Sequence, residues 1–210
     1  MSREAWYDFF ATLTVFADGA IVILIVLMIA ARFSVGARDR LLALRESFAS
    51  AGLAIAALIT TTATAGSLYL SEVAHLTPCQ LCWYKRIAMY PLAVLLIAAA
   101  IRRDRKIRFY GILLAALGAV VSTYHYLVER FPSLERGVSC DPLNPCTVTL
   151  VWKLHFISIP FMAGSAFVLA GLVLALTPPA HTPLRASAPG DADYVTPRTD
   201  DARRVLSETR

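Results

Sequence analysis

Residues 78–101 read PCQLCWYKRIAMYPLAVLLIAAAI, a C-x-x-C pair of cysteines that leads into a long apolar run. The part from Cys82 to Ile101 has about the 20 residues that an α-helix needs to cross the hydrocarbon core of a bilayer. Backbone groups in lipid must be hydrogen-bonded within the segment, and the run lacks the alternation of a barrel strand. We therefore expect a transmembrane helix that starts at the cysteine pair.

Four further apolar runs have a similar length. They extend roughly over Phe9–Ala31, Ser50–Leu70, Ile107–Val128 and Phe156–Leu176. The 210-residue chain is 57% hydrophobic, whereas soluble domains average about 45–50%. The sequence predicts an all-α integral membrane protein. We expect an extra N-terminal transmembrane helix and a cytoplasmic loop in residues 1–49, and a four-helix transmembrane bundle in residues 50–176.

Asp18 lies in the middle of the first run. A carboxylate at the centre of a transmembrane helix costs about 2.5–3.5 kcal/mol on insertion scales. The alternative, a cleavable signal peptide, is disfavoured because the N-terminus has no basic region and contains Glu4 and Asp8. We expect a true span in which Asp18 faces other helices, either for function or simply paired inside the bundle.

The basic residues predict the orientation. Most of the 20 Lys and Arg residues fall in the loop after the first run, in residues 102–108 and in residues 177–210. The positive-inside rule places these parts in the cytoplasm, so the N-terminus and the loops 71–81 and 129–155 should lie outside. Residues 177–210 are rich in proline and mixed charge, which predicts a disordered cytoplasmic tail. The net charge of +5 thus reflects topology, and no nucleic-acid motif is present.

All four cysteines fall on the predicted outer side, which is the oxidising side in bacteria. Four cysteines allow three pairings, and the spacing favours Cys79 with Cys82 and Cys140 with Cys146. A four-cysteine zinc site is an alternative, but the five-residue spacer with two prolines in the second pair does not suit it. Iron–sulfur ligation does not suit an oxidising face.

Two basic residues follow the C-x-x-C pair. Lys85 and Arg86 come three and four residues after Cys82, so they share its helical face. A helix N-terminus and a neighbouring cation both favour a thiolate over a thiol, and a cation could also hold a developing quinone anion. The alternative is that both side chains merely extend to the lipid head groups.

The second pair reads CDPLNPC over residues 140–146. Two prolines stiffen the spacer, and an exposed disulfide in a short, strained loop is attacked readily by a thiol. A purely structural disulfide on the outer loop explains the same residues equally well.

These two motifs carry a family resemblance. Residues 78–86 (PCQLCWYKR) and 139–146 (SCDPLNPC) resemble the DsbB family of thiol–quinone oxidoreductases, in particular its short-loop, BdbC-like branch. The resemblance covers about residues 50–176. It implies a membrane thiol oxidase that reoxidises an extracytoplasmic DsbA-like thioredoxin-fold protein and passes the electrons to a membrane quinone, ubiquinone or menaquinone.

The resemblance also implies residue roles. The reduced partner would attack Cys140, Cys146 would pass the disulfide to Cys79, and Cys82 would contact the quinone. Arg86 and His125 match family residues beside the quinone, although His125 could instead belong to an interfacial aromatic belt. The site needs an apolar slot open to the bilayer, which we expect to be lined by residues around Arg86, Met89 and Tyr90. Because proline lacks an N–H, Pro91 should kink the third span or free a carbonyl there. No metal is implied.

Two features depart from the family pattern: the extra first span and the close spacing of the second cysteine pair. Two rival functions also remain. One is a non-enzymatic membrane protein with two structural disulfides. The other is a reductase that runs electrons outward, or a quinone-epoxide-type reductase of the vitamin K family. In that family the loop pair precedes the C-x-x-C along the chain, the reverse of the order here, which argues against it.

Overall fold

A computed structural model describes residues 3–137, 140, 145–149 and 151–179. In these parts the protein is almost entirely helical, and five helices are long and apolar enough to cross a membrane. The predicted all-α membrane architecture is confirmed. The helices are α1 (Arg3–Ala30), α2 (Val35–Leu68), α3 (Gln80–Arg102), α4 (Arg108–Arg130) and α5 (Ile159–Leu176).

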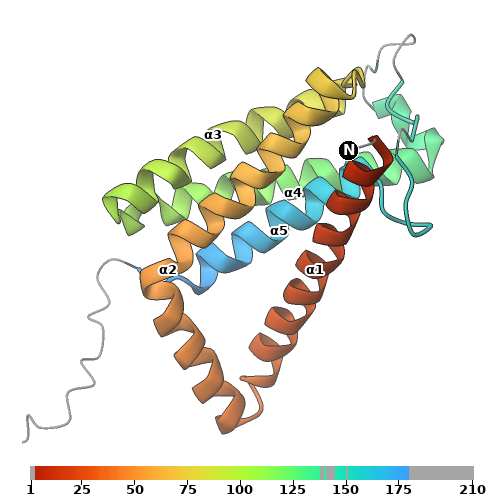
Figure 1. Cartoon of the computed structure of the whole chain (residues 1–210). Coiled ribbons are helices and arrows are strands. Elements are labelled where there is room, and N and C mark those ends of the chain that lie inside the picture. Colours follow the sequence, from red (N-terminus) through yellow and green to blue (C-terminus); the bar gives the residue numbers. More distant parts are fainter. Residues whose placement is uncertain (1–2, 138–139, 141–144, 150, 180–210) are drawn as a thin grey trace, which may run out of the picture.

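Helices α2 to α5 form the bundle in Figure 1, with α5 packed against both α2 and α4 and with α3 closing the other side. The core is built from side chains that are almost fully buried, namely Ala56, Leu92, Leu96, Phe167 and Leu174. Gly118 lets the Phe167 ring reach α4, because a Cβ at residue 118 would overlap that ring. Small residues at such contacts let membrane helices approach closely.

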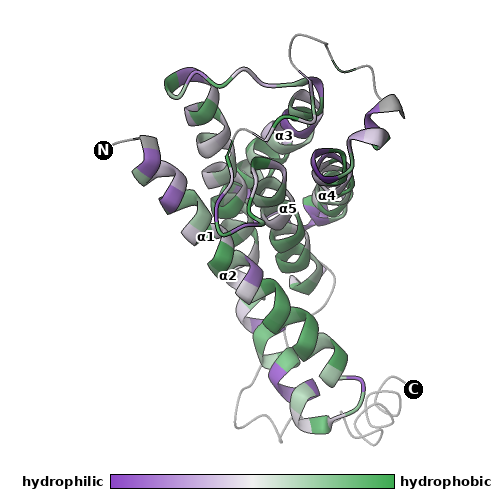
Figure 2. Cartoon of the chain, turned by 90° about the vertical axis from the view of Figure 1, so that its right-hand side faces the viewer, coloured by the Kyte–Doolittle hydropathy of each residue, from purple (hydrophilic) through white to green (hydrophobic). Residues whose placement is uncertain are grey.

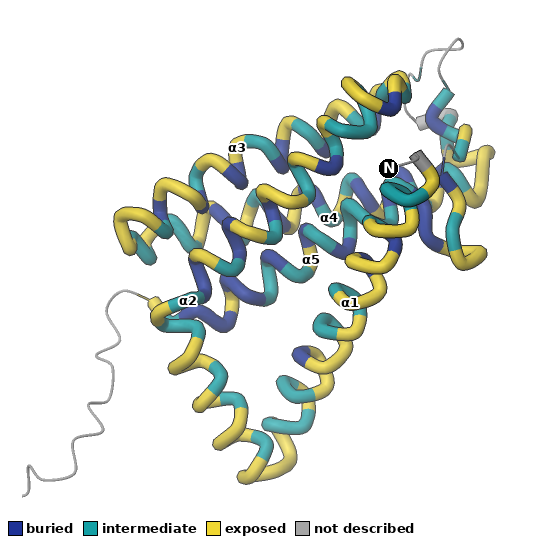
Figure 3. Tube along the Cα trace, in the orientation of Figure 1, coloured by how far each residue is buried: buried dark blue, intermediate teal, exposed yellow. Residues whose placement is uncertain are grey.

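The outer surface of the helices is apolar. Hydrophobic residues dominate the ribbons in Figure 2, and exposed positions follow the outward faces of the helices in Figure 3. Large side chains such as Val94 and Val120 are about two-thirds exposed on α3 and α4. A bilayer is the solvent in which such a surface is stable, because it buries the apolar area that water would penalise.

The start of α2 differs from the prediction. The helix begins at Val35, not near Ser50, so most of the expected loop is helical. The segment is rich in alanine, leucine and arginine, all strong helix formers, and helix formation does not require that a segment be apolar. Figure 1 shows that the turn between α1 and α2 stands away from α3, α4 and α5.

The first half of α1 is attached to the rest of the protein at several points. Lys153, in the segment between α4 and α5, forms ion pairs with Glu4 at 2.9 Å and with Asp8 at 2.8 Å. Its hydrogen bonds to Asp8 and Glu4 raise the pKa of Lys153. Further along α1, the Asp18 carboxyl group interacts with the side chain of Ser165 on α5. Asp18 therefore faces another helix, as predicted.

The N-terminus of α1 and the segment between α4 and α5 thus share one end of the bundle. At the opposite end Arg103, in a left-handed conformation with φ of 52°, ends α3, and the Arg108 guanidinium donates a hydrogen bond to the carbonyl of Thr177. The described part of the chain ends at Pro179, so the rest of the predicted tail lies outside it.

Helix α3 continues through Pro91, the residue at which the sequence predicted a change in the helix.

Candidate redox site

The C-x-x-C pair lies at the N-terminus of α3. Cys79 is the N-cap residue, with extended backbone, and its carbonyl accepts a hydrogen bond from the Trp83 N–H at 3.2 Å. Cys82 lies one turn further on, and the two Sγ atoms are 3.1 Å apart. Both residues are free thiols. The local sequence therefore folds so that two reduced sulfurs meet where the helix dipole is positive.

The two sulfurs have different electrostatic environments. The hydrogen bond that the Cys79 thiol donates to Cys82, followed by burial of the thiol, raises the pKa of Cys79. Cys82 accepts this hydrogen bond within the first turn of α3, where the positive end of the helix and the nearby Lys85 ammonium favour negative charge on a sulfur. The two sulfurs are therefore not equivalent: Cys79 donates the hydrogen bond and Cys82 accepts it beside a cation.

Lys85 points inward. It is only 5% exposed, so it does not extend to the lipid head groups. Its Nζ has no hydrogen-bond partner among the described residues, and the nearby charged or titratable groups include Cys82 and Glu129. A buried ammonium without a partner is costly, so its position calls for a compensating anion in the site.

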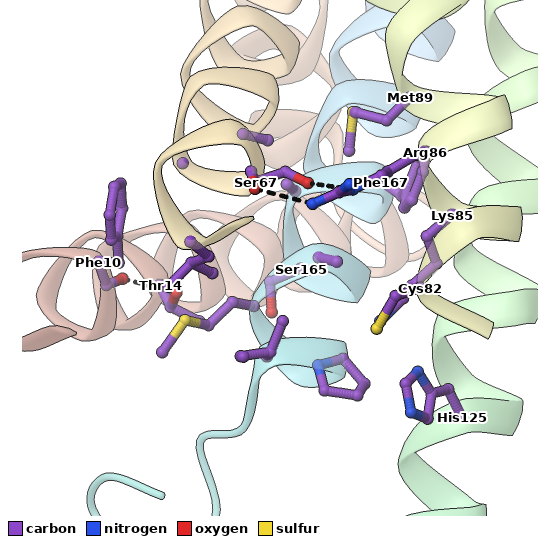
Figure 4. Close-up of a pocket in the computed structure, with 18 of the residues that line it drawn as sticks. Phe10, Thr14, Ser67, Cys82, Lys85, Arg86, Met89, His125, Ser165 and Phe167 are labelled. Carbon is purple, nitrogen blue, oxygen red and sulfur yellow. Dashed lines mark hydrogen bonds between the residues drawn. The ribbon is translucent and has the colours of Figure 1, made fainter. Parts of the chain in front are cut away.

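Arg86 bridges two helices. Its Nε donates to Ser67 Oγ and its Nη2 donates to the Ser67 carbonyl, both at 3.1 Å, so α2 holds the guanidinium in place. The group also lies 5.3 Å from the centre of the Trp83 ring. Figure 4 shows Arg86 reaching toward Ser67 from the helix that carries Cys82 and Lys85. The sequence predicted this shared face, whereas no local signal pointed to Ser67.

The second cysteine pair meets the first. Cys140 and Cys146 form a disulfide, the pairing that the spacing favoured, with their Cα atoms 6.0 Å apart. Cys146 is 1% exposed and belongs to one buried cluster with Cys79, Leu81 and Val128. The short loop thus brings a sulfur of the outer pair close to the inner pair, as disulfide exchange requires.

His125 on α4 joins the two pairs. Its Nε2 lies 3.2 Å from the Cys146 carbonyl oxygen and 3.7 Å from Cys79 Sγ. A carbonyl can only accept, so Nε2 carries the proton and Nδ1 is the unprotonated nitrogen. The side chain is 3% exposed, which contradicts the alternative of an interfacial aromatic-belt residue.

Glu129 was missed in the sequence. It follows His125 by four residues and therefore lies on the same face of α4, a spacing that could have indicated it. Its carboxyl group approaches Lys85 and Cys82, and its Oε2 has no hydrogen-bond partner in the described parts of the chain. The site therefore contains a cation and a carboxyl group beside the reactive sulfur.

A cavity of about 490 Å³ opens from these side chains into the bundle. This volume lies within the range of about 300–1,000 Å³ that is typical of ligand sites. The polar end holds Cys82, Lys85 and Arg86, and the remainder is largely apolar (Figure 4). Met89 and Tyr90 line it, as the sequence predicted. Such a cavity suits a molecule with one polar, electron-accepting end and an apolar body.

Two groups of side chains have spacings that a metal ion could use. Ligand atoms of Cys79, Cys82 and His125 lie within 4.8 Å of one another. Those of Glu135, Cys140 and Cys146 are equally close, but the disulfide between the two cysteines leaves them no thiolate to offer a metal. Three protein ligands are typical of a catalytic zinc site. The four-cysteine zinc alternative is contradicted, because Cys140 and Cys146 are bonded to each other and cannot both act as thiolate ligands.

Comparison with known proteins gives one consistent result. Residues 49–177 match the family described as disulfide bond formation protein DsbB. A probable disulfide formation protein of Oceanobacillus iheyensis is 47% identical over 108 residues, which are 51% of this chain and 74% of the relative. Disulfide bond formation protein C of Bacillus subtilis is 39% identical over 111 residues, 53% of this chain and 80% of the relative.

A probable disulfide formation protein of Coxiella burnetii is 39% identical over 113 residues, 53% of this chain and 77% of the relative. No solved structure gives a significant match. The family match begins at residue 49, so α1 and the first part of α2 lie outside it.

Proposed function

The chain belongs to the DsbB family of disulfide bond formation proteins, and from this premise we propose that it is a thiol:quinone oxidoreductase of the cell membrane. It would reoxidise an extracytoplasmic DsbA-like thioredoxin-fold protein and pass two electrons to a membrane quinone, ubiquinone or menaquinone. The observation that carries the proposal is the meeting of Cys146 with Cys79 at His125, beside a cavity that reaches Cys82.

The transfer begins at the outer pair. A thiolate of the reduced partner attacks Cys140, which is more accessible than the buried Cys146, and the Cys146 thiolate leaves. The second partner thiol then attacks the mixed disulfide and releases Cys140. The partner now holds a disulfide, and two electrons and the accompanying protons have passed to Cys140 and Cys146.

The inner pair takes part in its oxidised form. The Cys146 thiolate attacks Cys79 of the Cys79–Cys82 disulfide, and Cys82 leaves as a thiolate near the Lys85 ammonium. Attack by Cys140 on the Cys79–Cys146 bond restores the outer disulfide and frees Cys79. The described arrangement, with an outer disulfide and two inner thiols, corresponds to the state after this exchange.

The residues around the cavity fit a quinone. A quinone would supply an acceptor for two electrons and two protons. The Lys85 ammonium and the Arg86 guanidinium lie at the polar end, where they would stabilise negative charge on a ring oxygen. The Cys79 thiol and the Glu129 carboxyl group lie in the same site as Cys82 and would exchange protons with the quinone.

The proposed orientation follows from charge. The end of the bundle with Lys153 and the cysteine pairs would face outward, and the end with Arg103 and Arg108 would face the cytoplasm. The cysteines then lie on the oxidising side, where the partner is also found.

The test is quinone reduction by the purified protein in detergent, supplied with a reduced thioredoxin-fold oxidant. Wild type is compared with Cys82→Ser and Cys140→Ser, and with Ser47→Ala on an exposed part of α2 as the control. Turnover should be lost in both cysteine variants and kept in the control. In addition, the Cys140 thiolate of Cys146→Ser should attack the disulfide of an added oxidised partner and form a mixed disulfide, which persists because no Cys146 thiol remains to resolve it.

The rival function predicts a different result. A membrane protein with two structural disulfides would give no turnover with any quinone or partner, and its disulfides would resist reduction. That rival function also gives no reason for free thiols to line a cavity, as Cys79 and Cys82 do.

A further inference from the structure

Helix α1 lies outside the region that matches the family, yet it forms one wall of the cavity that reaches Cys82. The lining residues from α1 all fall in its first two-thirds and are Phe10, Leu13, Thr14, Phe16, Ala17 and Ala20. The same cavity is lined by Lys85 and Arg86 at its polar end. The extra helix is thus part of the site, although the family match does not include it.

Contacts at the outer end fix α1 against the bundle. Phe10 lies over Gly66 of α2 so closely that a Cβ there would come 3.0 Å from the ring. The Trp6 and Tyr69 rings have their centres 4.9 Å apart. Together with the ion pairs of Lys153 described above, these contacts keep the lining part of α1 in place.

The surface that α1 turns to the cavity is apolar and partly small. The Thr14 hydroxyl donates to the carbonyl of Phe10 within the same helix, so it offers no donor to a ligand. Ala17 and Ala20 leave room where a larger side chain would fill the cavity. Beyond Ala20 no residue of α1 lines the cavity, and Val22 and Ile23 are mostly exposed.

We propose that α1 is a specificity-determining wall that contacts the isoprenoid tail of the quinone next to its ring. The inference rests on the proposed function, since the occupant is the lipid quinone of that reaction. A quinone ring placed at Arg86 and Cys82 must direct its tail along the apolar part of the same cavity, where Ala17 and Ala20 lie. The width of the cavity at Ala17 and Ala20 then determines which quinones fit.

Photolabelling of the full-length protein tests this directly. Wild-type protein in detergent is irradiated with an azido-quinone that carries a short isoprenoid tail, and labelled peptides are mapped by mass spectrometry. We expect label on α1 between Phe10 and Ala20 as well as on the peptide of α3. Ala17→Phe should lower labelling and raise the KM for the quinone about tenfold or more, as the loss of pocket space usually does.

Gly19→Phe is the matched control. A Cβ at Gly19 meets nothing within 4 Å, and Gly19 does not line the cavity, so the same added ring should change neither labelling nor KM. If Ala17→Phe does not fold, Ala20→Phe replaces it, and the map of the wild-type label stands by itself.

The outcomes separate the two proposals. Label on α3 without label on α1, or equal effects of the two Phe variants, would overturn the role of α1 and leave the proposed function intact. Absence of label everywhere, together with absence of quinone turnover in wild type, would instead overturn the proposed function and this inference with it.

Discussion

The imidazole Nε2 of His125 lies 3.7 Å from the Sγ of Cys79, although 46 residues separate them in the chain. The same nitrogen lies 3.2 Å from the carbonyl oxygen of Cys146. One N–H therefore faces both cysteine pairs at the point where a disulfide must pass between them. It can stabilise a Cys79 thiolate and at the same time hold the loop that carries Cys146.

Replacing this donor should slow exchange between the pairs. We expect His125→Leu to reduce the rate roughly 10²-fold, because a small misplacement of reacting groups costs that much. His125→Gln retains an N–H and should recover part of the rate. Rapid acid quenching followed by thiol labelling measures the exchange. Equal rates in His125→Leu and wild type would refute the role of His125.

Lys85 should show opposite effects on activity and on stability. Lys85→Met keeps the shape of the side chain and removes a buried charge that has no hydrogen-bond partner in the described part of the protein. Burying a charge without a hydrogen-bonded partner is costly, so Lys85→Met should be at least as stable as wild type. Quinone reduction should nevertheless fall about a hundredfold, since a preorganised charge at the reacting end is lost.

Thermal unfolding in detergent and steady-state turnover give the two readouts for Lys85→Met. Lys85→Arg is the matched control, because it keeps the charge, and it should retain more activity than Lys85→Met. A Lys85→Met protein that is less stable than wild type and fully active would show that the lysine is only structural.

Gly118 should be intolerant of a methyl group. In Gly118→Ala the new Cβ would overlap the fully buried Phe167 ring, and such overpacking typically costs about 1–3 kcal/mol. Gly171→Ala is the control, because its Cβ would lie 3.5 Å from that of Ala115, an ordinary contact. Thermal unfolding should show a lower melting temperature for Gly118→Ala than for Gly171→Ala. Adding Phe167→Leu to Gly118→Ala should restore part of the lost stability.

Lys153 should form a covalent link to α1 with a zero-length carbodiimide reagent. Its Nζ lies within 3 Å of carboxylate oxygens of Glu4 and Asp8, so amide cross-links to these residues should appear in mass spectra. Lys153→Gln removes the amine and should abolish them. Cross-linking that is unchanged in this variant would mean that another amine reacts.

The pH dependence of the Lys153 contact has a definite sign. Its pKa is raised from the usual 10.5 by Asp8 and Glu4, so the charged form is favoured by folding. The stabilisation is fully present below pH 10.5 and is lost as the pH rises through the raised value. Because the Glu4 and Asp8 carboxylates are largely exposed, high salt should also weaken the ion pairs. The fluorescence of Trp6, whose ring centre lies 4.9 Å from that of Tyr69, reports whether this end of α1 stays in place.

Several features followed from the sequence because they depend on neighbouring residues. Apolar runs of about 20 residues predict spans, since backbone groups in lipid must be satisfied locally. The helical repeat places Lys85 and Arg86 on the face of Cys82, and the short spacer pairs Cys140 with Cys146. The division of residues 1–49, 50–176 and 177–210 into separate parts stays a prediction, as do the roles of the site residues.

Other features required the tertiary structure, because they arise between segments that are distant in the chain. The packing of α2, α3 and α4 determines three such contacts. His125 contacts both cysteine pairs, Ser67 accepts hydrogen bonds from Arg86, and Glu129 lies near Lys85. The same is true of α1 beside the cavity. Periodicity and length determined that the chain crosses the membrane, whereas only the packing of helix on helix determined which side chains surround the reactive sulfur.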